Sequence, residues 1–407
     1  MRYGNGRLVA AVTAACTFVL AVAGPSNADG PGVGTATVVT LGDSAISGEA
    51  GRWAGNTNDS YTKVDALGPT AYFDNASNTG ETIPGCHRSK AAQAHIGGGV
   101  LSANLACSGA RTYTHGTGED ENFKPGIDFY SDAQGRKGQA LALQEYASTR
   151  NVKAVAVLIG ANNYGFAAIV EQCIVNWYTS PSWWKNYCHD DEDMVERFTP
   201  ENQALITSQV RDSFLNVNQA MANAGYSPSQ WKLVAQTYWS PIPNGSGFRY
   251  PETGYTRQTV GGCGLWNADA DWANATVVAA MNNSVRNGAA QSGLSNVKTL
   301  EMRNSLVGRR LCENTVGLLE EKGVASWTSN GAVDKTEWVN QVRTSSTIGG
   351  PYQLQEGGHA NYWGQKAMRN CFRLAYSGGA VRGGECVIER KGLTNLGEPK
   401  MKLINVN

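Results

Sequence analysis

The sequence predicts an α/β fold in which helices connect the strands of a mostly parallel sheet. Short β-branched, apolar segments alternate along the chain with longer segments of helical periodicity, which is the pattern of strands joined by crossover helices. The first such strand, at 35–41, stops at Gly42-Asp43-Ser44. Strand ends of this kind border the crevice in which open α/β sheets bind their ligands.

The expected elements follow one another without an internal repeat. After the first strand they are a helix at 138–148, a strand at 153–159, a helix at 203–224, a strand at 231–238, a helix at 276–290, a strand at 297–302 and a helix at 362–376. Between them lie polar, aromatic-rich stretches at roughly 48–100, 164–200, 244–272 and 313–352. None has a periodic pattern long enough for a core of its own, so we expect loop insertions on one domain. The segment 377–407 is expected to be a surface tail.

The first 28 residues are typical of a secretory signal peptide. Arg2 and Arg7 precede an apolar segment at 8–24, and Ser26-Asn27-Ala28 fits a small-x-small cleavage site. Cleavage after Ala28 would leave a single domain at 29–407. The apolar segment is short for a membrane span. We therefore expect a secreted, extracellular protein without a stable membrane anchor.

The charge balance argues against nucleic acid as a partner. The chain has 34 Lys and Arg against 34 Asp and Glu, without a basic stripe. Its 48 glycines and 17% charged residues are typical of a loop-rich extracellular enzyme, and we expect it to be a monomer.

Cysteine usage agrees with export. Apart from Cys16 in the apolar leader, the chain has an even number of cysteines, which indicates disulfides in a secreted protein. The simplest of the many possible pairings joins sequence neighbours: Cys86–Cys107, Cys173–Cys188, Cys263–Cys312 and Cys371–Cys386. Zinc is a weaker alternative, because no Cys-x-x-Cys occurs and each Cys-His pair lacks the remaining ligand spacing.

Ser44 is a candidate nucleophile, and His359 is the candidate base. His359 lies in a Gly-containing loop before the last helix, with Glu356 three residues earlier. On a turn, this spacing places a carboxylate beside the imidazole while the other ring nitrogen faces the serine, as in a serine triad. Two alternatives stay open: Asp43 and Ser44 as simple helix caps, and Glu356 with His359 as a surface pair.

The other four histidines are weaker candidates. His95 and His115 lie in Gly-rich loops without a nearby carboxylate in sequence, and His87 is expected in a structural turn. His189 precedes the acidic run 190–193, which predicts a helix start favoured by the helix dipole. The same run lacks the spaced oxygen ligands of a calcium loop.

Two loops could supply an oxyanion site. Gly109 could present a bare backbone amide, and Asn162 follows the strand at 153–159 with a side-chain amide. Each could alone be ordinary turn chemistry.

Taken together, these motifs resemble the four blocks of the SGNH (GDSL) hydrolases, in the right order and over nearly all of the chain after residue 28. They are Gly42-Asp43-Ser44, Gly109, Gly160-Ala161-Asn162 and Glu356-x-x-His359. The chain is most similar to secreted actinomycete members with disulfide-rich loops, through the stretches 86–89, 105–110, 308–312 and 359–364. The resemblance implies a three-layer α/β/α sandwich of the flavodoxin-like SGNH type. It also implies Ser44 as nucleophile, His359 as base, and an oxyanion hole made by Ser44, Gly109 and Asn162.

Three positions depart from the family pattern. Ala161 stands where the family usually has Gly, Ala360 where it often has Pro, and Glu356 where it usually has Asp. In some relatives a backbone carbonyl replaces this acid.

We therefore expect a secreted serine esterase or lipase that works through an acyl-enzyme without a metal or cofactor. The aromatic residues after the Asn-containing loop, which are Phe166, Trp177, Trp183 and Trp184, are expected to wall the substrate site. Because aromatic side chains suit both acyl chains and sugar rings, lipid or phospholipid esters are the first choice and a carbohydrate O-acetyl ester the second. A non-catalytic cell-wall or polymer-binding protein on a hydrolase fold is the alternative of another class.

Overall fold

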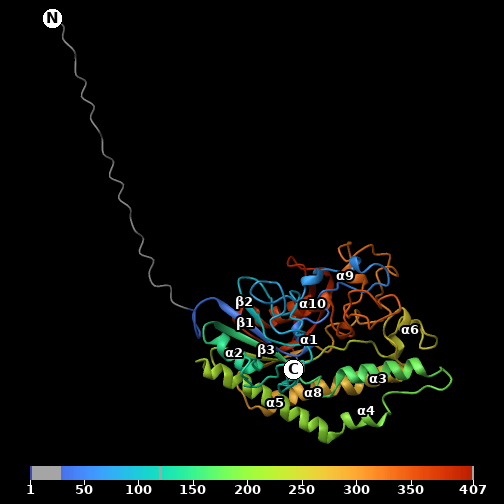
Figure 1. Cartoon of the computed structure of the whole chain (residues 1–407), viewed down its shortest axis with the longest axis horizontal. Helices are drawn as coiled ribbons and strands as arrows, with labels where there is room; N and C mark the ends of the chain where they lie inside the picture. Colours follow the sequence, from blue (N-terminus) through green and yellow to red (C-terminus); the bar gives the residue numbers. More distant parts are fainter. Residues whose placement is uncertain (2–28, 119–121, 406–407) are drawn as a thin grey trace.

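A seven-stranded sheet forms the centre of the protein in this computed structural model, in the order β2-β1-β3-β4-β5-β6-β7 (Figure 1). Its strands are β1 (Ala36–Gly42), β2 (Leu101–Asn104), β3 (Asn151–Leu158), β4 (Lys232–Gln236), β5 (Val297–Glu301), β6 (Gly384–Leu393) and β7 (Pro399–Ile404). All neighbouring strands pair in parallel except β6 and β7. The predicted α/β class with a mostly parallel sheet is therefore confirmed. The structure describes residues 1, 29–118 and 122–405, so the predicted signal peptide, apart from Met1, lies outside the described residues.

Helices cover both faces of the sheet. On one side lie α2 (Gln139–Ala147), α5 (Pro200–Asn223) and α8 (Val278–Gln291), with α5 packed between α2 and α8; α10 (Tyr362–Tyr376) lies on the other side (Figure 1). This arrangement is the three-layer sandwich that the sequence resemblance implies. The short helix α1 (Ser44–Ser47) directly follows β1.

The amphipathic pattern of α5 explains how the long helices attach to the sheet. The helix begins where the Thr199 side chain accepts a hydrogen bond from Asn202 N, with Pro200 at its first position. Its buried residues recur every three or four positions, from Ile206 through Val210 and Phe214. They therefore form one apolar stripe facing the core.

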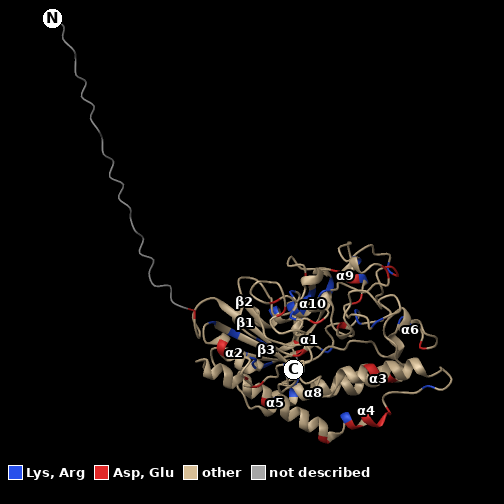
Figure 2. Cartoon of the chain, viewed as in Figure 1, with Lys and Arg blue, Asp and Glu red and all other residues tan. Residues whose placement is uncertain are grey.

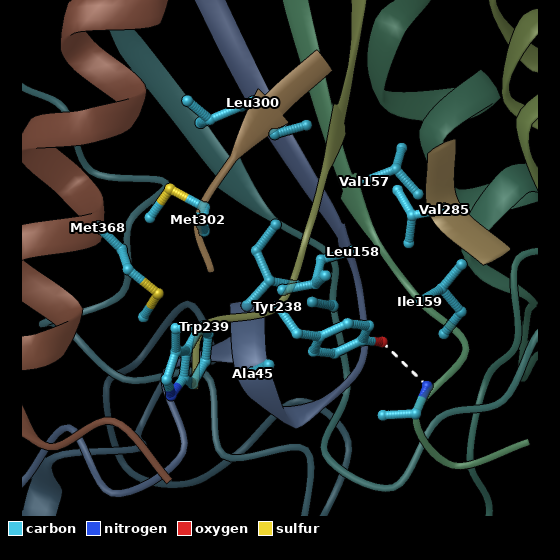
Figure 3. Close-up of a cluster of buried hydrophobic side chains, with 14 of the residues drawn as sticks. Ala45, Val157, Leu158, Ile159, Tyr238, Trp239, Val285, Leu300, Met302 and Met368 are labelled. Atoms are coloured by element: carbon cyan, nitrogen blue, oxygen red, sulfur yellow. Dashed lines mark hydrogen bonds between the residues drawn. The ribbon is translucent and has the colours of Figure 1, made fainter. Parts of the chain in front are cut away.

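The central strands are buried on both faces, as parallel strands between two helical layers are. In β3, every residue except Lys153 is buried. Figure 3 shows the result, with side chains of β3 and β5 packed between Met368 of α10 and Val285 of α8.

The insertions contain more secondary structure than the sequence predicts. The stretch 164–200 holds the 14-residue helix α3 (Phe166–Thr179) and the short helix α4 (Glu192–Arg197). Further short helices are α6 (Thr256–Thr259), α7 (Asn267–Trp272), the π-helical turn η4 (Ala273–Val277) and α9 (Ala332–Lys335). The 3₁₀ turns are η1 (Tyr61–Lys63), η2 (Gly68–Thr70), η3 (Gly245–Gly247), η5 (Leu354–Glu356) and η6 (Ser377–Gly379).

The structure corrects the expectation for the end of the chain and confirms the predicted disulfides. The segment expected to be a surface tail instead supplies β6 and β7, which extend the sheet beyond β5. Disulfide Cys371–Cys386 joins α10 to β6. All four predicted disulfides, which are Cys86–Cys107, Cys173–Cys188, Cys263–Cys312 and Cys371–Cys386, are present.

Charged residues of both signs are interspersed along the elements seen in Figure 2. The acidic run predicted to start a helix does so, with Glu192 and Asp193 in the first turn of α4. Within the described residues, no helix combines the length and apolarity that crossing a bilayer requires.

Candidate active site

Ser44 lies at the carboxyl end of β1, between the ends of β2 and β3. The strand order reverses direction at β1, and open α/β sheets bind ligands beside such a switch point. Asp43 caps helix α1, with its carboxylate accepting a hydrogen bond from Ala45 N at 3.0 Å. Because Asp43 alone satisfies the cap, the Ser44 hydroxyl remains available for chemistry.

The structure brings Ser44 and His359 together. His359 Nε2 lies 2.7 Å from Ser44 Oγ, which is the distance expected between a nucleophile and its base. The turn that carries His359 is fastened to the segment 338–340. Asn340 N donates to His359 O at 2.7 Å, and Gly358 N donates to Asn340 O at 2.9 Å. Ala360, where the family often has Pro, is buried and pairs with Val339, so this turn is well fixed without the proline.

The electrostatics of the site favour a neutral imidazole. Burial lowers the pKa of His359 below its usual value, and the Glu49 carboxylate opposes this by favouring the charged ring. The backbone carbonyls of Gly357 and Gln355 also raise the pKa of His359, while His87 lowers it. A ring that stays neutral near neutral pH can accept a proton from serine.

Glu356 does not take the position predicted for it. Its carboxylate accepts hydrogen bonds from Trp53 Nε1 at 2.8 Å, Tyr72 Oη at 2.5 Å and Gln353 N at 2.8 Å. His359 Nδ1 has no hydrogen-bond partner among the described residues. The physical reason is local: Glu356 ends the 3₁₀ turn η5, and its side chain folds back into a capping box with Gln353.

Burial is the main influence on the pKa of the Glu356 carboxyl. Burial raises the pKa of Glu356, against the opposing effect of the hydrogen bond from Tyr72. Because its carboxylate is bonded to three donors and not to the His359 imidazole, Glu356 stabilises the fold and does not orient the base.

Two of the three predicted oxyanion donors, Ser44 and Asn162, line the cavity around the serine, and Gly109 is not among its lining residues. Asn162 and Ser44 line the same cavity, and Asn162 Nδ2 donates to Ala110 O at 2.8 Å, which leaves its second N–H for a ligand. The backbone amides of Ser44 and Gly109 donate no hydrogen bond within the part of the chain that the structure describes. The Ser44 amide and the second N–H of Asn162 are therefore free, at this cavity, to bind a ligand oxygen.

The loop that carries Asn162 tolerates Ala161. Gly160 has φ +125°, which favours glycine, whereas Ala161 is not among the residues with positive φ. The alanine at the position where the family usually has Gly therefore introduces no backbone strain.

Tyr238 ties the two loops together and was missed from the sequence. Its hydroxyl donates to Asp43 Oδ2 at 2.5 Å and accepts from Ala161 N at 3.0 Å, the second bond being drawn in Figure 3. Burial raises the pKa of Asp43 to about 7. Tyr238 is the last residue of the strand predicted at 231–238, and this position at the carboxyl end of a strand was the one signal that could have pointed to it.

A cavity surrounds Ser44 and His359. Apart from these two residues, Asp43 and Asn162, its lining consists of Ala45, Ala161, Phe166, Tyr238, Trp239, Pro241, Met281 and Gly358. The wall is therefore largely apolar close to the reacting groups.

Of the four aromatic residues expected to wall this site, the structure places only Phe166 there. Trp177 is buried beside Trp266, with ring centroids 6.1 Å apart. Trp183 and Trp184 follow α3 and are 81% and 72% exposed. The expectation for these three residues is corrected, because α3 carries the chain away from Asn162.

The remaining histidines lie in other contacts. His87 Nδ1 is 2.8 Å from buried Glu49 Oε1, and the His87 ring stacks on Tyr72 with centroids 4.2 Å apart. His189 Nδ1 lies 2.6 Å from Asp269 Oδ1. His95 faces Ser102, and His115 contacts Gly109 O. Among the described residues, no group of three or more His, Cys, Asp or Glu side chains is placed to hold a metal ion.

Comparison with known proteins gives matches among solved structures. No protein-family model matches the chain, and no curated protein matches its sequence. The extracellular lipase of Streptomyces rimosus is 16% identical, with 84% of this chain and 99% of that chain aligned and a TM-score of 0.42. Phospholipase A1 of Streptomyces albidoflavus NA297 is 15% identical over 84% of this chain and 99% of that chain, with a TM-score of 0.45.

A third structure, the M. smegmatis aryl esterase, is 12% identical, with 66% of this chain and 84% of that chain aligned and a TM-score of 0.26. These neighbours are SGNH hydrolases, the family that the motifs of this chain resemble. At TM-scores below 0.5, the likeness carries no argument about the activity or substrate of this chain.

Proposed function

We propose that this chain is a secreted serine esterase that hydrolyses carboxylic esters through an acyl-enzyme on Ser44. The observation that carries the proposal is the 2.7 Å contact between Ser44 Oγ and His359 Nε2, inside a cavity bordered by unpaired N–H donors. A nucleophile, its base and an oxyanion site within one cavity are the parts that acyl transfer requires.

The mechanism follows from the positions of these groups. Ser44 Oγ attacks the ester carbonyl carbon while His359 Nε2 takes the hydroxyl proton. The amides of Ser44 and Gly109 and the Asn162 side chain bind the oxyanion that forms. His359 then protonates the leaving alcohol, and a water molecule repeats the cycle on the acyl-enzyme. No step in this sequence uses a metal or an organic cofactor.

Lipid or phospholipid acyl esters are the proposed substrates. The apolar side chains of Phe166, Trp239, Pro241 and Met281 around Ser44 favour an alkyl group over a sugar ring, which needs more hydrogen-bonding partners. A carbohydrate O-acetyl esterase is the second candidate, since an acetyl group also fits beside Ser44. The non-catalytic reading is disfavoured by the intact Ser44–His359 contact.

Four disulfides support an oxidising, extracellular location for the domain at 29–407. We propose that this domain acts as a monomer after removal of the signal peptide.

Covalent labelling tests the proposal directly. A fluorophosphonate probe is expected to label the folded protein at Ser44, and Ser44→Ala is expected to lose both the label and the hydrolysis of p-nitrophenyl butyrate. His359→Ala is expected to lose nearly as much, because removal of either group disables the same step. Labelling that persists in Ser44→Ala, or a folded wild-type protein that does not react, would reject the proposal.

A further inference from the structure

A second cavity adjoins the one around Ser44. Its exposed lining atoms are apolar. Phe166, Pro241 and Gly358 line both cavities, so the two lie on either side of these residues. Gly358 directly precedes the base His359, and no atom lies within 4 Å of the place where a β-carbon would stand on it.

Two helical segments form much of the wall. Ile169, Val170 and Cys173 come from α3, while Val277 and Val278 come from the π-helical turn η4 and the start of α8. A π-helical turn is rare and is frequent at functional sites.

Asn274 is the one residue with a polar side chain among those that line this cavity, and its polar atoms are already hydrogen-bonded to neighbouring residues. Its Oδ1 accepts from the Ser240 hydroxyl, and its Nδ2 donates to the carbonyls of Ile242 and Ala270 at 3.2 Å each. The cavity therefore offers no free polar side chain to a ligand. Such a space binds apolar groups and does not hold water well.

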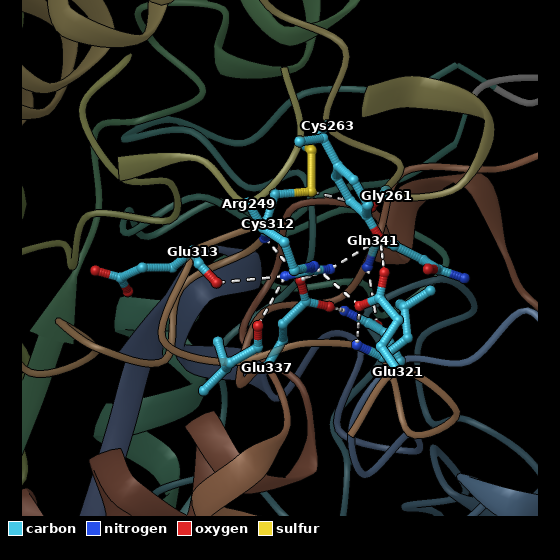
Figure 4. A network of polar contacts seen from close by, with 12 residues as sticks. Arg249, Gly261, Cys263, Cys312, Glu313, Glu321, Glu337 and Gln341 are labelled. Carbon is cyan, nitrogen blue, oxygen red and sulfur yellow. Dashed lines mark hydrogen bonds and ion pairs between the residues drawn. A yellow bond between two sulfur atoms is a disulfide. The ribbon is translucent and has the colours of Figure 1, made fainter. Parts of the chain in front are cut away.

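The walls are fixed by covalent and ionic links. Cys173 and Cys263, which line the cavity, belong to disulfides Cys173–Cys188 and Cys263–Cys312. Figure 4 shows the second disulfide within a polar network. There, Cys312 N donates to buried Glu337 Oε1 at 2.7 Å, and Arg249 Nη2 lies 3.0 Å from the same oxygen. The space is thus preformed, as ligand pockets usually are.

We infer that this cavity holds the alkyl chain of the substrate's acyl group, which passes from Ser44 between Phe166, Pro241 and Gly358. This inference rests on the proposed function and narrows it to esters of medium- and long-chain fatty acids. An acetyl group would leave the cavity unfilled. Each methylene moved from water into the cavity adds apolar burial that a transition state can use.

The test is a chain-length profile of kcat/KM for p-nitrophenyl esters from acetate to palmitate. In the wild-type protein, kcat/KM is expected to rise about fourfold per added methylene until the cavity is full. Val170→Phe places a larger side chain on the lining face of α3. It is expected to lower kcat/KM for octanoate and longer esters at least tenfold and to leave acetate within about twofold.

Val175→Phe is the matched control, because Val175 lies on the same helix and is 47% exposed. It is expected to keep the wild-type profile. If Val170→Phe does not fold, as judged by thermal melting, Val278→Phe fills the cavity from the opposite wall and is expected to shorten the profile in the same way.

Two outcomes would overturn the inference, and they differ in what they say about the proposed function. Acetate hydrolysis with a flat chain-length profile, or with a profile that neither filling variant alters, would reject the acyl-chain site and leave the esterase intact. Failure to hydrolyse any ester, acetate included, would reject the proposed function and this inference with it.

Discussion

The replacement of Glu356 by Gln separates a structural carboxylate from a catalytic one. Glu356 Oε1 accepts from the Tyr72 hydroxyl, and Oε2 accepts from Trp53 Nε1 and Gln353 N. In Glu356→Gln, the amide oxygen can keep the two N–H donors while the amide NH₂ faces Tyr72. The Tyr72 hydroxyl can then reverse its role and accept. We therefore expect a destabilisation of about 1 kcal/mol, from the loss of charge-assisted bonds.

Glu356→Leu is the contrasting variant. It removes both acceptor oxygens and leaves two buried donors, Trp53 Nε1 and the Tyr72 hydroxyl, without partners, at about 1–3 kcal/mol each. A total of roughly 2 kcal/mol or more is a large share of the stability of a typical domain. The difference between the two variants measures what the hydrogen bonds of Glu356 contribute to the fold.

The assay combines thermal melting with the pH dependence of kcat/KM for p-nitrophenyl butyrate. For Glu356→Gln we expect a melting temperature lower by a few degrees, a kcat/KM within a few-fold of wild type, and an acidic limb at an unchanged pH. If Glu356 oriented His359, the loss of its charge would move that limb to lower pH and reduce kcat. A large loss of kcat with an unchanged melting temperature would refute the structural role.

Two further predictions concern groups that act on the site from nearby. Glu49→Gln is expected to shift the acidic limb of kcat/KM to lower pH. The Glu49 carboxylate raises the pKa of His359 more than His87 lowers it, so its removal keeps the ring neutral in more acidic solution. An unshifted limb would contradict this prediction. Tyr238→Phe is expected to destabilise the protein by about 1–3 kcal/mol and to lower kcat, because the loops of Asp43 and Ala161 lose the hydroxyl that bonds to both. An unchanged melting temperature and unchanged kinetics would show that these loops keep their positions without it.

Features that depend on neighbours in sequence could be predicted. The β-branched run before Gly42 and the alternation of strands and helices fix a parallel sheet, and Ser44 follows from the end of the first strand. The disulfides follow from an even cysteine count and the simplest pairing, and His359 follows because the other histidines had weaker surroundings.

Features that depend on tertiary packing were missed. Helix α3 carries Ile169, Cys173 and Trp177 four residues apart, which is a helical pattern, yet it lies in a stretch rich in polar and aromatic residues that reads as a loop. Strand β6 forms parallel to β5 although the two are far apart in sequence. No local sequence pattern predicts such a pairing, because parallel strands are joined by long connections and their partners lie far away in sequence.

The acid of the expected triad shows why spacing alone can mislead. A spacing of three positions from Glu356 to His359 is compatible with a carboxylate beside an imidazole, but on a 3₁₀ turn the glutamate can close a capping box on Gln353 instead. Which of the two forms depends on donors from distant segments, here Trp53 and Tyr72. Their two hydrogen bonds hold the carboxylate in the core, away from the His359 ring, whose Nδ1 has no hydrogen-bond partner among the described residues. The base is positioned by the turn that carries it, which Asn340 fastens through His359 O and Gly358 N, and the glutamate contributes by keeping that turn in place.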